Sequence, residues 1–332
     1  MKQTPFRYVL LLGMIGLAAC SGRGVDQAVG TQNSSDDYQL KICVLGSGTV
    51  DVKDWTFDVY ETLQGAENDL GAEIIYVEAA DSPKDFQKEV HAFSSLGCAI
   101  VVGQGSQFEE AAITVGNAYP ETFFLVVDSR AYHSANVIGI SVDSRQGFYL
   151  LGMMAAEMGS RAGLVGGAEI LPVTEAFAGF VDGAQAVSPE FPVSEIYLDD
   201  WADVAGAKQT ALDMLAGGAD FVVPYAGIAG VGVYHAVVEE NLWTFGVMGD
   251  QHDQAPKNIV ASFMVDYGQG VANIMSEIKA GVFKPTGNIV FDLADEDVVF
   301  ITYNEGSDYY VPQELRDEVE QVRVKFAVGE IE

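Results

Sequence analysis

The chain has 332 residues, of which 49% are hydrophobic, and it carries 48 acidic against 17 basic residues for a formal net charge of −31. This length suits two average domains with full cores. The acidic excess argues against nucleic acid as a partner and against a basic membrane-binding patch, because both interactions depend on lysine and arginine.

The amino-terminal segment is typical of an exported lipoprotein. Lys2 and Arg7 precede an apolar run, Val9–Ala19, which is shorter than the roughly 20 residues needed to cross a bilayer. We therefore interpret residues 1–19 as a signal peptide. The small residues directly before Cys20 resemble a bacterial lipobox, which implies cleavage before Cys20 and lipidation of that residue. An ordinary signal peptide followed by a chance cysteine is the alternative.

Residues 20–38 are small and polar, so we expect a flexible tether between the lipid and the folded body. No later segment is long and apolar enough to span a membrane. The sequence thus predicts an exported protein that faces the periplasm or the cell exterior and is held at the membrane by its lipid alone.

From residue 39 onward, short apolar runs alternate with segments of helical spacing. The expected strands are 42–45, 73–77, 99–102, 123–127, 163–165, 193–198, 221–223, 244–247, 258–264, 288–291 and 298–301. The expected helices are 55–70, 83–96, 107–118, 145–159, 174–186, 204–216, 230–240, a segment around 271–278, and 312–326. This alternation indicates parallel sheets with helices on both faces.

We therefore predict an α/β fold of two lobes with a ligand cleft between them. Lobe 1 takes residues 39–142 plus about 264–284, and lobe 2 takes 143–263 plus about 285–332. Ligands of open parallel sheets bind at the carboxyl ends of the strands, so two facing lobes would enclose a ligand.

Cys43 and Cys98 each lie in or beside an apolar run. Two buried free thiols are the favoured interpretation, and a disulfide is the alternative in an exported protein. The histidines lack metal-ligand spacing, although Asp250, His252 and Asp253 cluster, and no Gly-x-Ser-x-Gly elbow is present. We expect no metal, no cofactor and no enzymatic activity.

Several motif segments occur in an order that is known from one family. They are Gly46–Asp51, Gly147–Gly152, Gly163–Gly167, Phe177–Ala184, Ala226–Val233 and Gly246–Gln251. The set resembles the basic membrane lipoprotein family, which comprises substrate-binding lipoproteins of ABC importers known mainly as purine nucleoside receptors. The resemblance spans nearly the whole mature chain. It implies a periplasmic-binding-protein type I fold, a nucleoside-type ligand and an ABC permease partner, and we expect a monomer.

The resemblance also indicates where a ligand binds. Trp55 and Trp201 are placed to stack on a flat ring, although Trp55 also fits a buried helix stripe and Trp201 a surface loop. Asp128 and Asp250 follow strands, where they accept hydrogen bonds from a ligand or form turns. The segment from Gly227 opens a helix whose N–H groups face a ligand oxygen. The expected ligand-binding residues are Asp51, Trp55, Asp128, Trp201, Gly227, Met248 and Asp250.

Three positions depart from the family pattern. The family's early acidic residue is Gly46 here, its ribose-binding aspartate is Met248, and its lysine aligns with Val265. Ribose hydroxyls would lose charged partners in such a site. A riboflavin-type ligand is therefore one alternative, and a ligand sensor for a membrane signalling partner is another.

Overall fold

The computed structural model describes residues 40–46, 55–78, 83–130, 132–285 and 287–331. All of them belong to one compact unit. The expected signal peptide, Cys20, the tether and Asp51 lie outside the described residues.

The first sheet has seven strands in the order β12-β6-β4-β3-β1-β2, with β5 antiparallel to β6. The strands are β1 (Leu40–Gly46), β2 (Ala72–Glu78), β3 (Ile100–Gln104), β4 (Phe123–Val127), β5 (Tyr132–Ser134), β6 (Val137–Val142) and β12 (Ile289–Phe291). All pairs other than β5–β6 are parallel. This arrangement places the carboxyl ends of β1, β3 and β4 at one edge.

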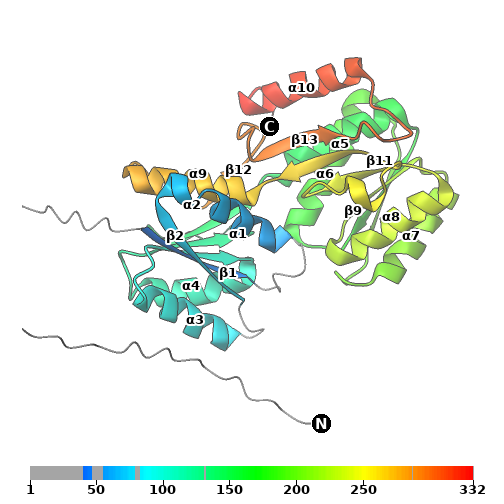
Figure 1. Cartoon of the computed structure of the whole chain (residues 1–332). Helices are drawn as coiled ribbons and strands as arrows, with labels where there is room; N and C mark the ends of the chain where they lie inside the picture. Colours follow the sequence, from blue (N-terminus) through cyan, green and yellow to red (C-terminus); the bar gives the residue numbers. More distant parts are fainter. Residues whose placement is uncertain (1–39, 47–54, 79–82, 131, 286, 332) are drawn as a thin grey trace, which may run out of the picture. The chain divides into compact units, whose positions relative to one another are not determined.

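Helices cover both faces of the first sheet (Figure 1). On one face, α3 and α4 bury Phe93 and Val115 against the strands. On the other face, α1 and α9 bury Leu63 and Ile274. The helices are α1 (Trp55–Gly65), α2 (Glu67–Leu70), α3 (Pro83–Ser95), α4 (Glu109–Gly116) and α9 (Tyr267–Ala280).

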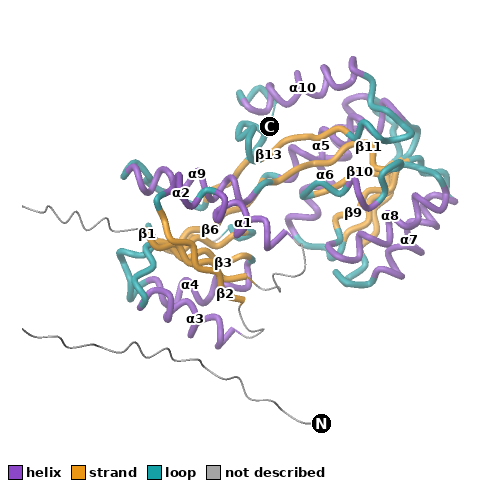
Figure 2. The backbone as a smooth tube through the Cα atoms, viewed as in Figure 1, coloured by secondary structure: helices purple, strands orange, loops and turns teal. Residues whose placement is uncertain are grey.

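The second lobe contains two three-stranded sheets, β8-β7-β9 and β10-β11-β13. An isolated parallel β-bridge between Phe221 and Trp243 joins the two sheets. The last strand of this lobe is antiparallel, and β11 and β13 run side by side in Figure 2. The strands are β7 (Ala162–Gly166), β8 (Val193–Tyr197), β9 (Phe221–Tyr225), β10 (Thr244–Val247), β11 (Ile259–Val265) and β13 (Val299–Tyr303). The helices are α5 (Ser144–Met158), α6 (Leu171–Val187), α7 (Val204–Ala216), α8 (Gly230–Glu240) and α10 (Gln313–Ala327).

Aspartates start three of the helices. The side chains of Asp143, Asp203 and Asp266 accept hydrogen bonds from backbone N–H groups at 3.1, 2.8 and 2.8 Å, which satisfies donors that a helix start leaves free. Glycines set the α5–α6 contact, because a Cβ at Gly152 or Gly183 would collide with backbone of the opposite helix. The Gly-Phe-Tyr-Leu-Leu-Gly motif is thus a helix-packing motif.

Both lobes repeat one strand order, β2-β1-β3-β4-β6 in the first and β8-β7-β9-β10-β11 in the second. This order reverses direction between β1 and β3 and again between β7 and β9. Ligands of open α/β sheets bind at such switch points, outside the carboxyl ends of the strands. The two switch points therefore mark the edges where a site is expected.

The chain passes between the two sets of strands at residue 143, at residue 266 and after β12. The third crossing lies later than expected. The sequence places residues from about 285 in lobe 2, but β12 pairs with β6 through Ile289–Ile140 and Phe291–Val142. The short strand therefore extends the first sheet before the chain crosses.

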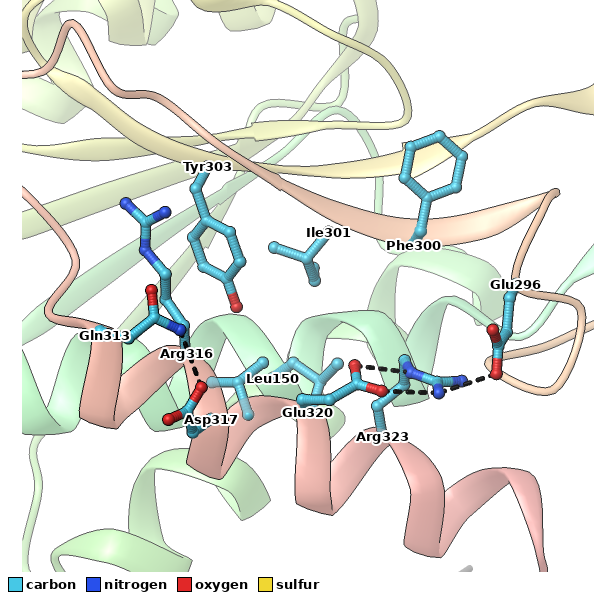
Figure 3. A pocket seen from close by; sticks show the side chains of 11 residues that line it. Leu150, Glu296, Phe300, Ile301, Tyr303, Gln313, Arg316, Asp317, Glu320 and Arg323 are labelled. Atoms are coloured by element: carbon cyan, nitrogen blue, oxygen red, sulfur yellow. Dashed lines mark hydrogen bonds and ion pairs between the residues drawn. The ribbon is translucent and has the colours of Figure 1, made fainter.

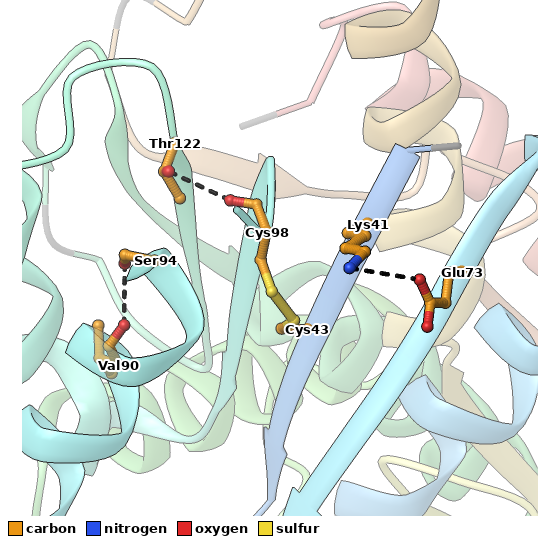
Figure 4. The surroundings of a disulfide bond; sticks show 7 residues. All are labelled: Lys41, Cys43, Glu73, Val90, Ser94, Cys98 and Thr122. Atoms are coloured by element: carbon orange, nitrogen blue, oxygen red, sulfur yellow. Dashed lines mark hydrogen bonds and ion pairs between the residues drawn. A yellow bond between two sulfur atoms is a disulfide. The ribbon is translucent and has the colours of Figure 1, made fainter. Parts of the chain in front are cut away.

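The prediction of two free thiols is wrong. Cys43 on β1 and Cys98, two residues before β3, form a disulfide with Cα atoms 6.0 Å apart (Figure 4). The physical reason is the pairing of their strands, since Ala99 donates a backbone hydrogen bond to Lys41 at 2.9 Å and thereby aligns the two segments. Both residues are buried.

Candidate ligand-binding site

The carboxyl edge of the first sheet presents Gly46, Gln104 and Asp128 at the ends of β1, β3 and β4. Gly46 has no room for a side chain, because a Cβ there would collide with the Tyr76 hydroxyl. Gln104 is fully buried, at 0% exposure. Sequence reasoning missed Gln104, since the expected strand ended two residues earlier.

Asp128 follows β4 in the left-handed backbone region, with φ 55°. Part of the residue reaches solvent, but the surrounding protein excludes much of the water near its carboxyl group. This desolvation raises the pKa of Asp128 above its usual range, and the Arg130 charge lowers it in part. The carboxylate is thus an incompletely solvated acceptor at the site edge.

Tyr225 ends β9 of the second lobe and lies within electrostatic range of Asp128 from the first lobe. Burial raises its pKa to about 12, with a further upward contribution from Asp128. Its hydroxyl lies 3.5 Å from the Ser144 hydroxyl at the start of α5. Burial, followed by the Asp128 charge, also raises the pKa of Tyr267 well above its usual value. We call Asp128, Arg130, Ser144, Tyr225 and Tyr267 the polar cluster; of these residues, the sequence predicts only Asp128 as a site residue.

Trp201 lies at the switch point of the second lobe. A Cβ at Gly167, directly after β7, would collide with its ring, and a Cβ at Gly227, after β9, would lie 3.3 Å from it. Gly227 has φ +56°, a conformation that glycine adopts without strain. The Trp201 backbone carbonyl accepts a hydrogen bond from Ala229 at 2.9 Å. Trp201 is 40% exposed, so part of the residue is open to contact.

Met248 and Asp250 follow β10. Met248 is half-buried with φ 66°. The Asp250 carboxylate accepts a hydrogen bond from the His252 backbone at 3.0 Å and lies 3.2 Å from the imidazole Nδ1. These contacts are those of a turn-forming aspartate, and a ligand contact at Asp250 stays a prediction.

The remaining expected residues are placed as follows. Trp55 begins α1, and its side chain lies outside the described part of the structure. Val265 is 7% exposed and belongs to the main hydrophobic core. The position that aligns with the family's lysine therefore packs inside the protein.

Two cavities lie away from these edges. The first, of about 480 Å³, lies between α10 and β13, where Tyr303, Arg316 and Arg323 line it among others (Figure 3). Arg323 forms ion pairs at 2.8 Å with Glu296 and Glu320. The second, of about 380 Å³, lies between α1 and α9. Neither is lined by an expected ligand-binding residue.

The described residues contain no group of histidine, cysteine, aspartate or glutamate side chains that could hold a metal. In the same part of the chain, none of the helices combines the length and apolarity needed to cross a membrane.

The family model for ABC transporter substrate-binding proteins of PnrA-like type matches residues 39–332. The chain belongs to this family. The family is one of substrate-binding proteins rather than enzymes. The expected resemblance to basic membrane lipoproteins is thereby confirmed.

Named relatives of this PnrA-like chain extend over most of its length. Basic membrane protein A1 of Borrelia garinii subsp. bavariensis is 25% identical, and the match covers 97% of this chain and 94% of the relative. The ABC transporter nucleoside-binding protein BmpA of Lactococcus lactis is 26% identical over 85% of this chain and 86% of its own.

A solved structure supports the α/β fold. An ABC transporter solute-binding protein from Conexibacter woesei has a TM-score of 0.73 at 22% identity, covering 88% of this chain and 98% of that one. The expected periplasmic-binding-protein type I architecture, with parallel sheets flanked by helices, is confirmed.

Proposed function

We propose that this PnrA-like protein binds one flat heterocyclic ligand of purine nucleoside type between the carboxyl edges of its two lobes and delivers it to an ABC permease. The observation that carries the proposal is the position of Trp201, whose partly exposed indole lies against the β7–β9 switch point. The nucleoside-binding relative from Lactococcus lactis supports this ligand class.

The two edges would divide the recognition between them. An indole face contributes about 1–3 kcal/mol by stacking on a flat ring, and it accepts many rings. Trp55, at the start of α1, is proposed as the second stacking wall. Asp128 and the hydroxyl of Tyr225 supply acceptors and a donor for ring nitrogens or sugar hydroxyls. Stacking thus sets the ligand class, and the polar cluster sets its orientation.

Two further properties belong to the same proposal. The protein is exported, which agrees with its disulfide because such bonds persist in oxidising compartments. After processing, lipidated Cys20 holds it at the membrane through a tether ending near residue 38. In this role it acts as a monomer, since a single two-lobed unit supplies both edges.

The proposal is tested by identifying what the protein carries and what it binds. Denaturation of freshly purified protein should release a purine nucleoside or base, which mass spectrometry identifies. Calorimetric titration should then show binding of inosine or guanosine at a one-to-one ratio. Binding of riboflavin without binding of inosine or guanosine would replace the proposed ligand class. If the protein binds none of these three compounds, the proposal is overturned.

A further inference from the structure

Gln104 carries a buried side-chain amide that has no hydrogen-bond partner among the described residues. It is the last residue of β3 and has 0% exposure. Within the described residues, neither its Nε2 nor its Oε1 has a partner. Its backbone carbonyl accepts a hydrogen bond from the Gln107 side chain at 3.3 Å. Buried polar groups are nearly always paired, so an unpaired amide calls for an explanation.

The register of the sheet places this amide at the proposed site. Side chains alternate along a strand, so Gln104 shares a face with Val102, and it pairs across with Val127, directly before Asp128. On the other side, the β1–β3 register continues from Leu45–Gly103 to Gly46, which has no side chain. Gln104 therefore stands at the β1–β3 switch point, flanked by a side chain on one side only.

Beyond Gln104 the backbone leaves the sheet, because Gly105 has φ +122°. The amide is consequently the final side chain that β3 contributes to the edge. The Gln104 side chain is enclosed in this structure, so a ligand reaches it only when the carboxyl edge of the first sheet opens. Binding proteins that close around their ligands move between such open and closed states.

We infer that Gln104 is a specificity-determining residue that reads a ring edge carrying an N–H donor next to a carbonyl acceptor. A carboxamide offers one donor group and one acceptor at matching spacing, so it forms two parallel hydrogen bonds with a lactam or imide edge. The amide then gains both missing partners in one step. This inference rests on the proposed function, which supplies the ring.

The chemistry also sets what the site rejects. A ring that lacks one of the two groups would leave half of the buried amide unpaired, and sites of this kind discriminate strongly against such analogues. Inosine carries the N–H and the carbonyl on its six-membered ring. Purine riboside has the same sugar and the same ring size but carries only a ring nitrogen acceptor there.

The test compares inosine with purine riboside by calorimetric titration of the protein and its Gln104→Met variant. Methionine keeps the length of glutamine and removes both polar atoms. We expect the variant to lose about tenfold or more in inosine affinity while its purine riboside affinity changes less than about twofold. The matched control is Gln209→Met, on the exposed surface of α7, which should change neither.

A second readout separates recognition from a structural role. Because the amide lacks partners among the described residues, Gln104→Met should keep or raise the thermal midpoint of the ligand-free protein. A lowered midpoint, or an equal loss of affinity for both ligands, would overturn the inference while the proposed function stands. Absence of binding of any nucleoside to the parent protein would overturn both.

Discussion

Arg130 donates a hydrogen bond to Glu175 over 2.6 Å, and this ion pair joins the segment after β4 to α6 of the other lobe. The hydrogen bond to Glu175 raises the pKa of the Arg130 guanidinium above its usual value. Both side chains are about two-fifths exposed, at 43% and 37%. An exposed pair contributes roughly 0–1 kcal/mol, so its effect should appear in ligand kinetics rather than in overall stability.

We expect Glu175→Gln to speed ligand dissociation about two- to fivefold, since losing up to about 1 kcal/mol weakens the arrangement that links the lobes. Stopped-flow fluorescence measures the rate. Salt should reduce the difference between parent and variant. The control is Asp182→Asn, which breaks the comparable Arg145–Asp182 pair at 2.5 Å between two helices of the second lobe. Equal effects of the two variants would contradict a role for the lobe-joining pair.

Trp201→Ala should weaken ligand binding by about 1–3 kcal/mol, because it removes the stacking face at the second switch point. Trp201→Phe should restore most of the loss. Calorimetry with the ligand released from the protein provides the measurement. Tyr310→Ala, which removes an aromatic that is 48% exposed elsewhere, is the control. Unchanged affinity in Trp201→Ala would make Trp201 a surface tryptophan, the alternative recognised from the sequence.

The sequence predicted the elements well where hydrophobic periodicity decides them. The strands at 123–127 and 244–247 and the helices at 204–216 and 230–240 have the expected bounds. The strand β6 was missed, because Val137–Val142 follows a turn and contains a glycine. The predicted assignment of β12 to lobe 2 was wrong, because this short apolar segment can extend a sheet of either lobe. Only the strand pairing decides between the two sheets.

The site was less predictable, since it depends on which strand ends meet. Periodicity cannot show that Gln104 lies beside Gly46 or that Tyr225, at the end of β9, approaches Ser144 at the start of α5. One signal was available for Gln104, namely a polar residue between two glycines directly after a buried strand. Nor could the alignment of Val265 with a lysine reveal that this position faces the core.

Asp128→Asn should stabilise the ligand-free fold slightly at neutral pH. The pKa of Asp128 is raised in the folded state, mainly by desolvation, so ionised Asp128 disfavours folding above its unfolded pKa. This penalty disappears as the pH falls through the raised folded value. The advantage of the asparagine variant should therefore be present at pH 7 and fade at acidic pH. Thermal midpoints measured between pH 4 and 8 check the sign, and an advantage that grows on acidification would contradict it.

The same substitution should weaken ligand binding at neutral pH, because a carboxylate accepts stronger hydrogen bonds than an amide. If Asp128→Asn gains stability but loses ligand affinity, Asp128 contributes to ligand binding rather than to packing of the fold. Asp317→Asn is the control, as Asp317 is exposed on α10 and bonds to Gln313 of the same helix, so its substitution should change affinity little.

Loss of the Cys43–Cys98 disulfide should lower stability without lowering affinity. The bond spans a sequence separation of 55 residues, for which the chain-entropy model gives about 4 kcal/mol. The thermal midpoint of the double variant Cys43→Ala, Cys98→Ala should therefore be several degrees lower than that of the parent protein. Cys98 precedes β3, whereas Gln104 ends it, so the bond lies at the strand end opposite the proposed site. Calorimetric titration should give the same ligand affinity for both proteins.

Production of the unchanged chain in a reducing and in an oxidising compartment provides the matching experiment. Only the oxidised protein should resist thiol alkylation after unfolding without reductant, and only it should show the higher thermal midpoint. Adding reductant during unfolding should remove the difference between the two preparations. Free alkylation of both cysteines in the exported protein would contradict the disulfide, and with it the support that the bond gives to export.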